Sequence, residues 1–184
     1  MDAGSGAQEE EEELVMAMPR RELFAVRGFS RTMQLPVLDS LNQEHWFALP
    51  TVLEEDIDAK EVRIALLVCR DHQWLVEESG VLLHAAPVCA GVVAFGSGLA
   101  GLKQLARAAG AELVGSTRVR IELYGYLNED RLEETRPYFI LVYLLRVPEE
   151  TAAPAGMSWI GARHLRDLTL DPASSLVADV CADV

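Results

Sequence analysis

The sequence predicts an α/β protein in which helices cover the faces of one mixed β-sheet. The apolar, β-branched run at 62–69 is typical of a central strand that is buried on both faces, and the run at 138–147 is the most strongly strand-like of the chain. Apolar side chains recur at helical spacing over 98–109. The segments follow in the order strand, strand, strand, helix, strand, strand, strand, helix, which favours such a sheet.

The 184 residues, half of them hydrophobic, suffice for one compact domain, and we divide the chain into three parts. Residues 1–13 hold six acids and no base, and we expect a disordered acidic leader. Residues 14–58 are predicted to form a short N-terminal extension, and residues 59–184 the main domain. The extension begins with a strand at 14–18 and a helical turn that Pro19 starts. A helical block with Leu38, Leu41, His45 and Trp46 follows, and the acidic stretch 51–61 is predicted to be an exposed connection.

The main domain continues with short strands at 74–76 and 90–95. A helix is predicted over 98–109, with Ser97 as its N-cap and Gly110 as the glycine that ends it. Residues 118–127 alternate basic and apolar side chains, as in a strand with one face in solvent. A short strand at 157–160, a short helix at 162–168 and a last helix opened by Asp171 and Pro172 complete the domain.

Charge and cysteine usage exclude several classes of partner and site. Of the formal net charge of −13, residues 14–184 carry −7, which repels a phosphate backbone, so we expect no duplex nucleic acid as a partner. The three cysteines and four histidines show no zinc-ligand spacing. Free thiols and the absence of a signal peptide at the start of the sequence predict a cytoplasmic protein.

One uncharged stretch, 81–102, is long enough to span a bilayer. Pro87 and four glycines interrupt it, and no basic anchor flanks it, so we expect a buried strand and helix and no membrane partner.

From Val62 onward the order of segments resembles the Nudix fold. The family's motif is G-x5-E-x7-R-E-U-x-E-E-x-G-U, where U is aliphatic, and its helix carries glutamates that hold divalent cations against a pyrophosphate. The runs YFILVYLLRV and MSWIGARHLRDLTLDPAS are similar to the late strands and the helix opening of many Nudix hydrolases, and ELVMAMPRRELFAVRGF resembles an extension of some bacterial Nudix-like proteins. The resemblance implies a Nudix-like α/β/α sandwich with a short N-terminal extension.

The motif's carboxylates are missing from this chain. With the closing glycine on Gly110, Lys103 takes the arginine position, Gln104 the first glutamate, and Arg107 and Ala108 the paired glutamates. Residues 81–111 contain no Asp or Glu, and Lys103 and Arg107 would repel a cation. Mg²⁺ and Mn²⁺ need oxygen ligands, so we predict no metal site, no cofactor and no catalytic residues of the family's kind.

Basic side chains are the candidates for ligand binding. Arg118 and Arg120 are predicted to share a sheet face with Glu122, and arginine binds phosphate with two parallel hydrogen bonds. Together with Trp159 as a pocket wall, the candidates are Lys103, Arg107, Arg118, Arg120, Glu122 and Trp159. The alternative interpretation of the basic residues is surface charge that balances an acidic protein, and Glu122 is expected to form an ion pair.

Two functions follow from these observations. The first is a catalytically inactive Nudix-like module that binds a protein or a nucleotide-like anion. The second is a divergent metal-dependent hydrolase of nucleoside diphosphate-linked substrates, with carboxylates outside the usual helix such as Glu77 and Glu122. Because the apolar segment 81–102 needs a cover, we also expect a homodimer, unless Leu82 and Leu83 belong to the core.

Overall fold

The computed structural model describes residues 13–23, 27–32, 34–92 and 98–182, so most of the acidic leader at 1–13 lies outside the described residues. The described part contains four α-helices, which are α1 (Leu35–Asp39), α2 (Pro50–Glu55), α3 (Leu99–Val114) and α4 (Pro172–Ala182). It also contains nine strands, which are β1 (Val15–Pro19), β2 (Gly28–Ser30), β3 (Trp46–Ala48), β4 (Ala59–Arg70), β5 (Gln73–Glu77), β6 (His84–Pro87), β7 (Arg120–Asn128), β8 (Tyr138–Arg146) and β9 (Met157–Gly161).

All nine strands belong to one sheet, with the path β2-β7-β8-β4-β1-β3. The long strand β4 runs parallel to β8 over nine residue pairs, whereas the other pairings are antiparallel. At twelve residues, β4 is long enough to pair with β1, β6 and β5 in turn along its other edge. The predicted mixed sheet and its central strand are confirmed.

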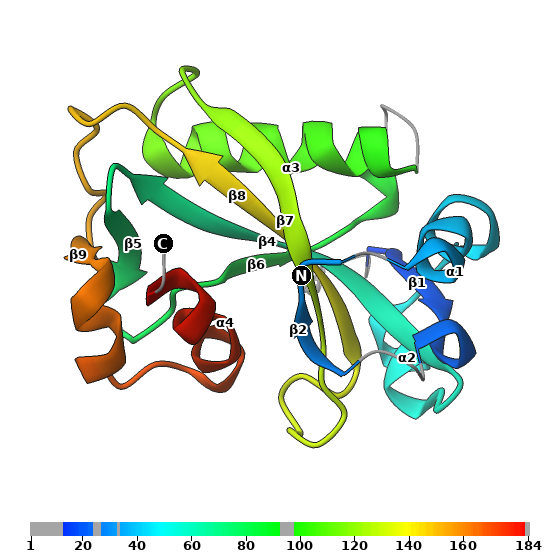
Figure 1. Ribbon diagram of the computed structural model, residues 1–184. Coiled ribbons are helices and arrows are strands. Elements are labelled where there is room, and N and C mark those ends of the chain that lie inside the picture. Colours follow the sequence, from blue (N-terminus) through cyan, green and yellow to red (C-terminus); the bar gives the residue numbers. More distant parts are fainter. Residues whose placement is uncertain (1–12, 24–26, 33, 93–97, 183–184) are drawn as a thin grey trace, which may run out of the picture.

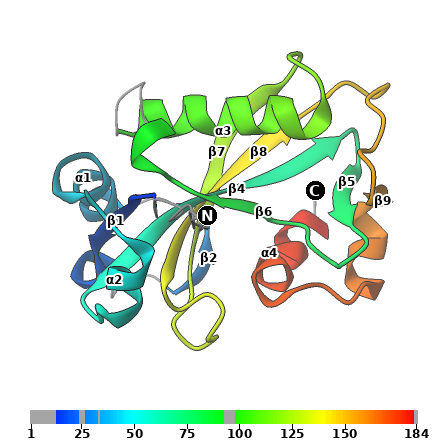
Figure 2. The ribbon, with the colours of Figure 1, turned by 180° about the vertical axis from the view of Figure 1, so that it is seen from behind.

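Helices cover both faces of this sheet (Figures 1 and 2). The first core lies on the α3 side and includes Leu102 and Ala106 together with Leu145 of β8. The second core lies on the α4 side and includes Val177, Cys181 and Leu67 of β4. The arrangement is the α/β/α sandwich expected from the sequence.

The N-terminal extension contributes strands to the sheet itself. Here β1 pairs with β4, β3 pairs with β1, and β2 pairs with β7 at the opposite end of the path. The prediction of one helical block through Trp46 is wrong, because a π-helical turn ends at Glu44 and Trp46 begins β3. The acidic stretch 51–61 is also not a plain connection, since it forms α2 and the first residues of β4.

The helix predicted over 98–109 begins one residue later and ends five residues later than expected. It runs from Leu99 to Val114, with Gly98 at the N-cap position, whereas Ser97 lies outside the described residues. Gly110 is buried inside the helix, where a Cβ atom would lie 2.7 Å from Cδ2 of Leu145. The helix ends at Gly115, which has a φ of +63° and is therefore the glycine that closes it.

Two further predictions concern the segment before α3 and the start of α4. The strand expected at 90–95 is wrong in its first part, because Ala90–Val92 forms a 3₁₀ turn, and its remainder lies outside the described residues. The Asp171 prediction is confirmed, since its Oδ1 atom accepts hydrogen bonds from the backbone N–H groups of Ala173 and Ser174 at the start of α4.

The apolar segment that begins at Val81 is part of the core. Leu82 is fully buried, Leu83 is 4% exposed, and their backbone N–H groups donate to Oγ of Ser174 in α4. These two residues therefore belong to the core, and the reason for which the sequence predicted a homodimer does not hold for them. In the described ranges, no helix is both long and apolar enough to cross a membrane.

Candidate functional site

The outer face of α3 carries two cationic residues one helical turn apart. Lys103 and Arg107 are exposed on it, and Nη2 of Arg107 donates to the carbonyl oxygen of Val119 at 3.2 Å. Because Gly115 ends the helix and Gly110 packs against β8, the family motif aligns better with its closing glycine on Gly115. Its three helix glutamates then fall on Ala109, Glu112 and Leu113, so α3 contains a single carboxylate.

These residues do not fit the divalent cations that the Nudix fold implies. Such ions take several oxygen ligands, whereas α3 offers the one carboxylate of Glu112 together with two cationic side chains. In the described part of the chain, no group of three His, Cys, Asp or Glu side chains is placed to hold a metal ion. We therefore derive no reaction step through a metal ion on this helix.

Arg120, Glu122 and Arg146 lie together where β7 begins and β8 ends. Arg120 is directly opposite Arg146 in the antiparallel register, and Oε1 of Glu122 lies 3.7 Å from Nη2 of Arg146. With Ile121, these three residues line a shallow cavity of about 230 Å³. The sequence-predicted candidates Arg120 and Glu122 thus share one site, and the expected ion pair of Glu122 is made with Arg146.

A buried thiol adjoins this site. Nη1 of Arg146 lies 3.7 Å from Sγ of Cys69 in β4 and can donate to it. Burial raises the pKa of the Cys69 thiol, and Arg146 opposes this effect only in part. The thiol is therefore kept protonated and is a poor nucleophile.

The other predicted ligand residues do not join this cluster. Lys103 and Arg107 belong to α3, which covers the face of β7 that carries Val119 and Ile121, whereas Arg120 and Glu122 project from the opposite face. Arg118 is exposed just before β7.

Trp159 has structural partners. Its Nε1 atom donates to the carbonyl oxygen of Thr151 at 3.1 Å, and the guanidinium of Arg70 lies 4.5 Å from its ring centroid. The ring is partly buried against the α3-side core. Trp159 therefore anchors the loop after β8 and does not form a wall of the Arg120 cavity.

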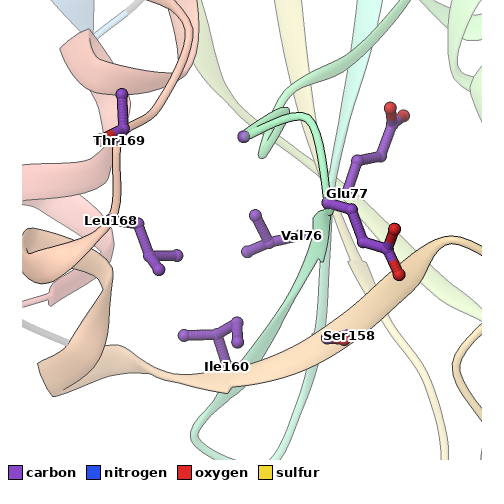
Figure 3. A pocket seen from close by; sticks show the side chains of 8 residues that line it. Val76, Glu77, Ser158, Ile160, Leu168 and Thr169 are labelled. Carbon is purple, nitrogen blue, oxygen red and sulfur yellow. The ribbon is translucent and has the colours of Figure 1, made fainter.

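A second cavity, of about 340 Å³, lies between β5, β9 and the segment before α4 (Figure 3). Its apolar walls are Val76, Ile160 and Leu168, which point toward one another, and Glu77 lies at its rim. Oε1 of Glu77 lies 3.2 Å from Nδ1 of His84, and its Oε2 accepts from Ser79 Oγ at 3.1 Å. Glu77 and Glu122, the carboxylates of the divergent-hydrolase alternative, line different cavities.

A buried polar network near β4 was not predicted from the sequence. Lys60 is fully buried, and its Nζ atom donates to Oδ1 of Asn128 at 2.6 Å and to the carbonyl of Tyr138 at 3.3 Å, and pairs with Asp130 at 2.9 Å. Arg20 of the N-terminal extension binds the same Asp130 oxygen at 3.0 Å. The apolar run that begins at residue 62 was the only feature of the sequence that indicated burial of Lys60.

Comparison with known proteins rests on structure alone. No family model matches the chain, and no curated protein matches it. The solved structure of "Tm1382, a putative Nudix hydrolase" superposes with a TM-score of 0.76 at 17% identity and covers 93% of this chain and 99% of that chain. The chain has the Nudix fold. The fold that the resemblance implied is thus confirmed.

Two further solved structures match with TM-scores below 0.5. "A putative oxidoreductase (SMa0793)" from Sinorhizobium meliloti matches at 15% identity and a TM-score of 0.47, over 74% of this chain and 45% of that chain. "A hydrolase, NUDIX family" from Clostridium perfringens matches at 11% identity and a TM-score of 0.43, over 67% of this chain and 97% of that chain.

Proposed function

We propose that this Nudix-fold chain is a binding module that does not hydrolyse phosphoanhydrides through bound metal ions. The observation that carries the proposal is the outer face of α3, where Lys103 and Arg107 are exposed and Glu112 is the helix's one carboxylate. Hydrolysis in this fold family depends on cations that neutralise the diphosphate, and a single carboxylate supplies too few oxygen ligands to hold them.

The divergent-hydrolase alternative has less support. Glu77 is engaged by His84 and Ser79, and Glu122 faces Arg146. Because the two carboxylates line different cavities, they do not form a shared ligand set for a metal ion.

The binding surface in this proposal is the end of β7 and β8, with Arg120, Arg146 and Glu122. The guanidinium groups of Arg120 and Arg146 lie directly opposite one another on adjacent strands and repel. Glu122 lies 3.7 Å from Arg146 and forms an ion pair with Arg146 but not with Arg120. An additional anionic group would relieve this repulsion, and guanidinium binds a carboxylate or a phosphate with two parallel hydrogen bonds. The chemistry that the surface recognises is therefore an anion. The three free cysteines fit the cytoplasmic setting that we include in the proposal.

The test is a hydrolysis assay with Mg²⁺ or Mn²⁺ and nucleoside diphosphate-linked compounds, such as ADP-ribose, NAD and a dinucleoside tetraphosphate. We expect no turnover above that of heat-denatured protein. Metal-dependent turnover that is lost in Glu112→Gln, Glu77→Gln or Glu122→Gln, and kept in the exposed control Glu149→Gln, would overturn the proposal.

A further inference from the structure

Half of strand β7 is an open sheet edge. Strand β8 pairs with β7 from Arg120 onward, but on the outer side β2 pairs only with Tyr126–Asn128. Gly125 marks the boundary, since a Cβ atom there would lie 2.3 Å from the backbone oxygen of Ser30. In Figure 1, β2 accompanies only the lower part of β7. In the described part of the chain, residues 120–124 therefore have a strand on one side only, and such an edge is a template for another strand.

The side chains along this edge alternate between charge and apolar surface. Arg120 and Glu122 are exposed on the face away from α3. On the α3 face, Val119 is buried, Ile121 is partly buried, and Leu123 is 37% exposed and ranks among the exposed large hydrophobic residues. A strand added to this edge would therefore meet apolar side chains on the α3 face of the sheet and charged side chains on the opposite face.

Arg120 has no counter-ion among the described residues. No carboxylate within that part of the chain lies within ion-pair distance of its guanidinium, and its cross-strand neighbour is Arg146. The one acid beside them, Glu122, faces Arg146. The edge therefore carries an unpaired cation two residues from an acid, and this is the pattern that an antiparallel copy of itself complements.

We propose that a second copy of the chain pairs antiparallel with this edge, about a two-fold axis at Ile121. This inference names the partner of the anion-binding surface proposed above. In that register Arg120 lies opposite Glu122 of the partner subunit, and Glu122 lies opposite Arg120 of the partner subunit. Ile121 lies opposite Ile121 of the partner subunit, and Leu123 lies opposite Val119 of the partner subunit.

Charge selects this register over its neighbours. An axis at Arg120 sets two arginines opposite one another, and an axis at Glu122 sets two glutamates opposite one another; like charges in directly opposed positions destabilise a sheet. Only the axis at Ile121 gives two reciprocal ion pairs. The interface is short, and interfaces below about 1,200 Å² in total are typical of transient association. The dimer is therefore expected to dissociate on dilution.

The test is a charge-swap series measured by sedimentation velocity over a wide range of protein concentration. We expect a concentration-dependent dimer for the wild type and a dissociation constant raised roughly tenfold or more in Arg120→Glu and in Glu122→Arg, since each single change creates two like-charge pairs. The double variant restores both pairs and should restore the dimer. Lys103→Glu, an exposed change on α3, is the matched control and should leave the dimer intact.

A cross-link tests the register directly. In a Cys89→Ser background, Ile121→Cys places two thiols at the proposed axis, where opposed Cα atoms lie about 4.5–5.5 Å apart, within disulfide range. Oxidised glutathione should then give a covalent dimer, whereas Ala108→Cys on the outer face of α3 should not.

Three results would overturn the inference. These are a wild type that is monomeric throughout, a dimer that none of the charge changes affects, and a monomer whose melting temperature pyrophosphate raises through Arg120. The last result would assign the surface to a small anion. Turnover in the hydrolysis assay contradicts the proposed function but changes none of these sedimentation results, so the two failures are distinguishable.

Discussion

Glu129, just after β7, is a buried carboxylate with a charged partner. Its side chain is 2% exposed and accepts from Nε and Nη2 of Arg131 at 2.9 and 2.7 Å, and from the backbone N–H of Arg131 at 2.9 Å. The side-chain hydrogen bonds from Arg131 are the main cause that lowers the pKa of Glu129 from 4.5 to about 2. A lowered pKa in the folded state means that ionised Glu129 stabilises the fold above the unfolded value and that this contribution is lost as pH falls toward 2.

We therefore expect Glu129→Gln to flatten the acid limb of the stability curve. At neutral pH the variant should be less stable by on the order of 1 kcal/mol, a modest figure because the Arg131 side chain is exposed to solvent. The difference should shrink as pH falls below the unfolded value of 4.5, and the variant and the wild type should converge only at about pH 2 and below. Urea unfolding between pH 2 and pH 7 measures this, with the exposed Glu133→Gln as control. A wild type and a variant with parallel pH profiles would contradict the assignment.

Lys60 shows the limit of sequence reasoning at this scale. Lys60 lies in the acidic stretch that was predicted to be an exposed connection, yet its side chain is fully buried. Three acceptors, from β7, β8 and the loop between them, converge on its ammonium group. Burial is the main cause that lowers its pKa, and Asp130 opposes that effect. Partners that are 68 and 78 residues away leave no trace in the local pattern.

Among the helices and strands, α3 shows which features of an element the sequence predicts and which depend on tertiary contacts. The apolar runs predicted β4, β5, β7, β8 and β9, because burial imposes its period directly on the residue types. The end of α3 was predicted wrongly, since a glycine inside a helix has the same local appearance as one that closes it. What distinguishes Gly110 is the close approach of Leu145, a tertiary contact. The grouping of Arg120 and Arg146 likewise follows from strand register, which the sequence does not contain.

The close approach at Gly110 predicts the effect of adding a side chain. We expect Gly110→Val to destabilise the protein by roughly 1–3 kcal/mol, because the new methyl groups enter space that Leu145 occupies. Ala108→Val, on the exposed face of the same helix, should cost about 0.5 kcal/mol from helix propensity alone. Thermal and denaturant unfolding of both variants measures the difference. Equal costs for the two substitutions would mean that Gly110 is not tightly packed.

At the scale of the whole molecule, one sheet with a helix layer on each face reproduces the Nudix sandwich over nearly the full length of Tm1382. Helix α3 lies within this shared fold, and its one carboxylate is Glu112. With the motif's closing glycine on Gly115, two of its three helix glutamate positions hold Ala109 and Leu113, and the single carboxylate of Glu112 supplies too few oxygen ligands for such ions. We therefore expect that α3 does not hold divalent cations.

Titration of the protein with Mn²⁺, followed by the electron paramagnetic resonance signal of the free ion, tests that claim most directly. We expect the free-ion signal to rise as in buffer, apart from weak binding by surface acids that Glu112→Gln leaves unchanged. A stoichiometric Mn²⁺ site that is lost in Glu112→Gln and kept in Glu133→Gln would contradict the account and place a metal centre on α3.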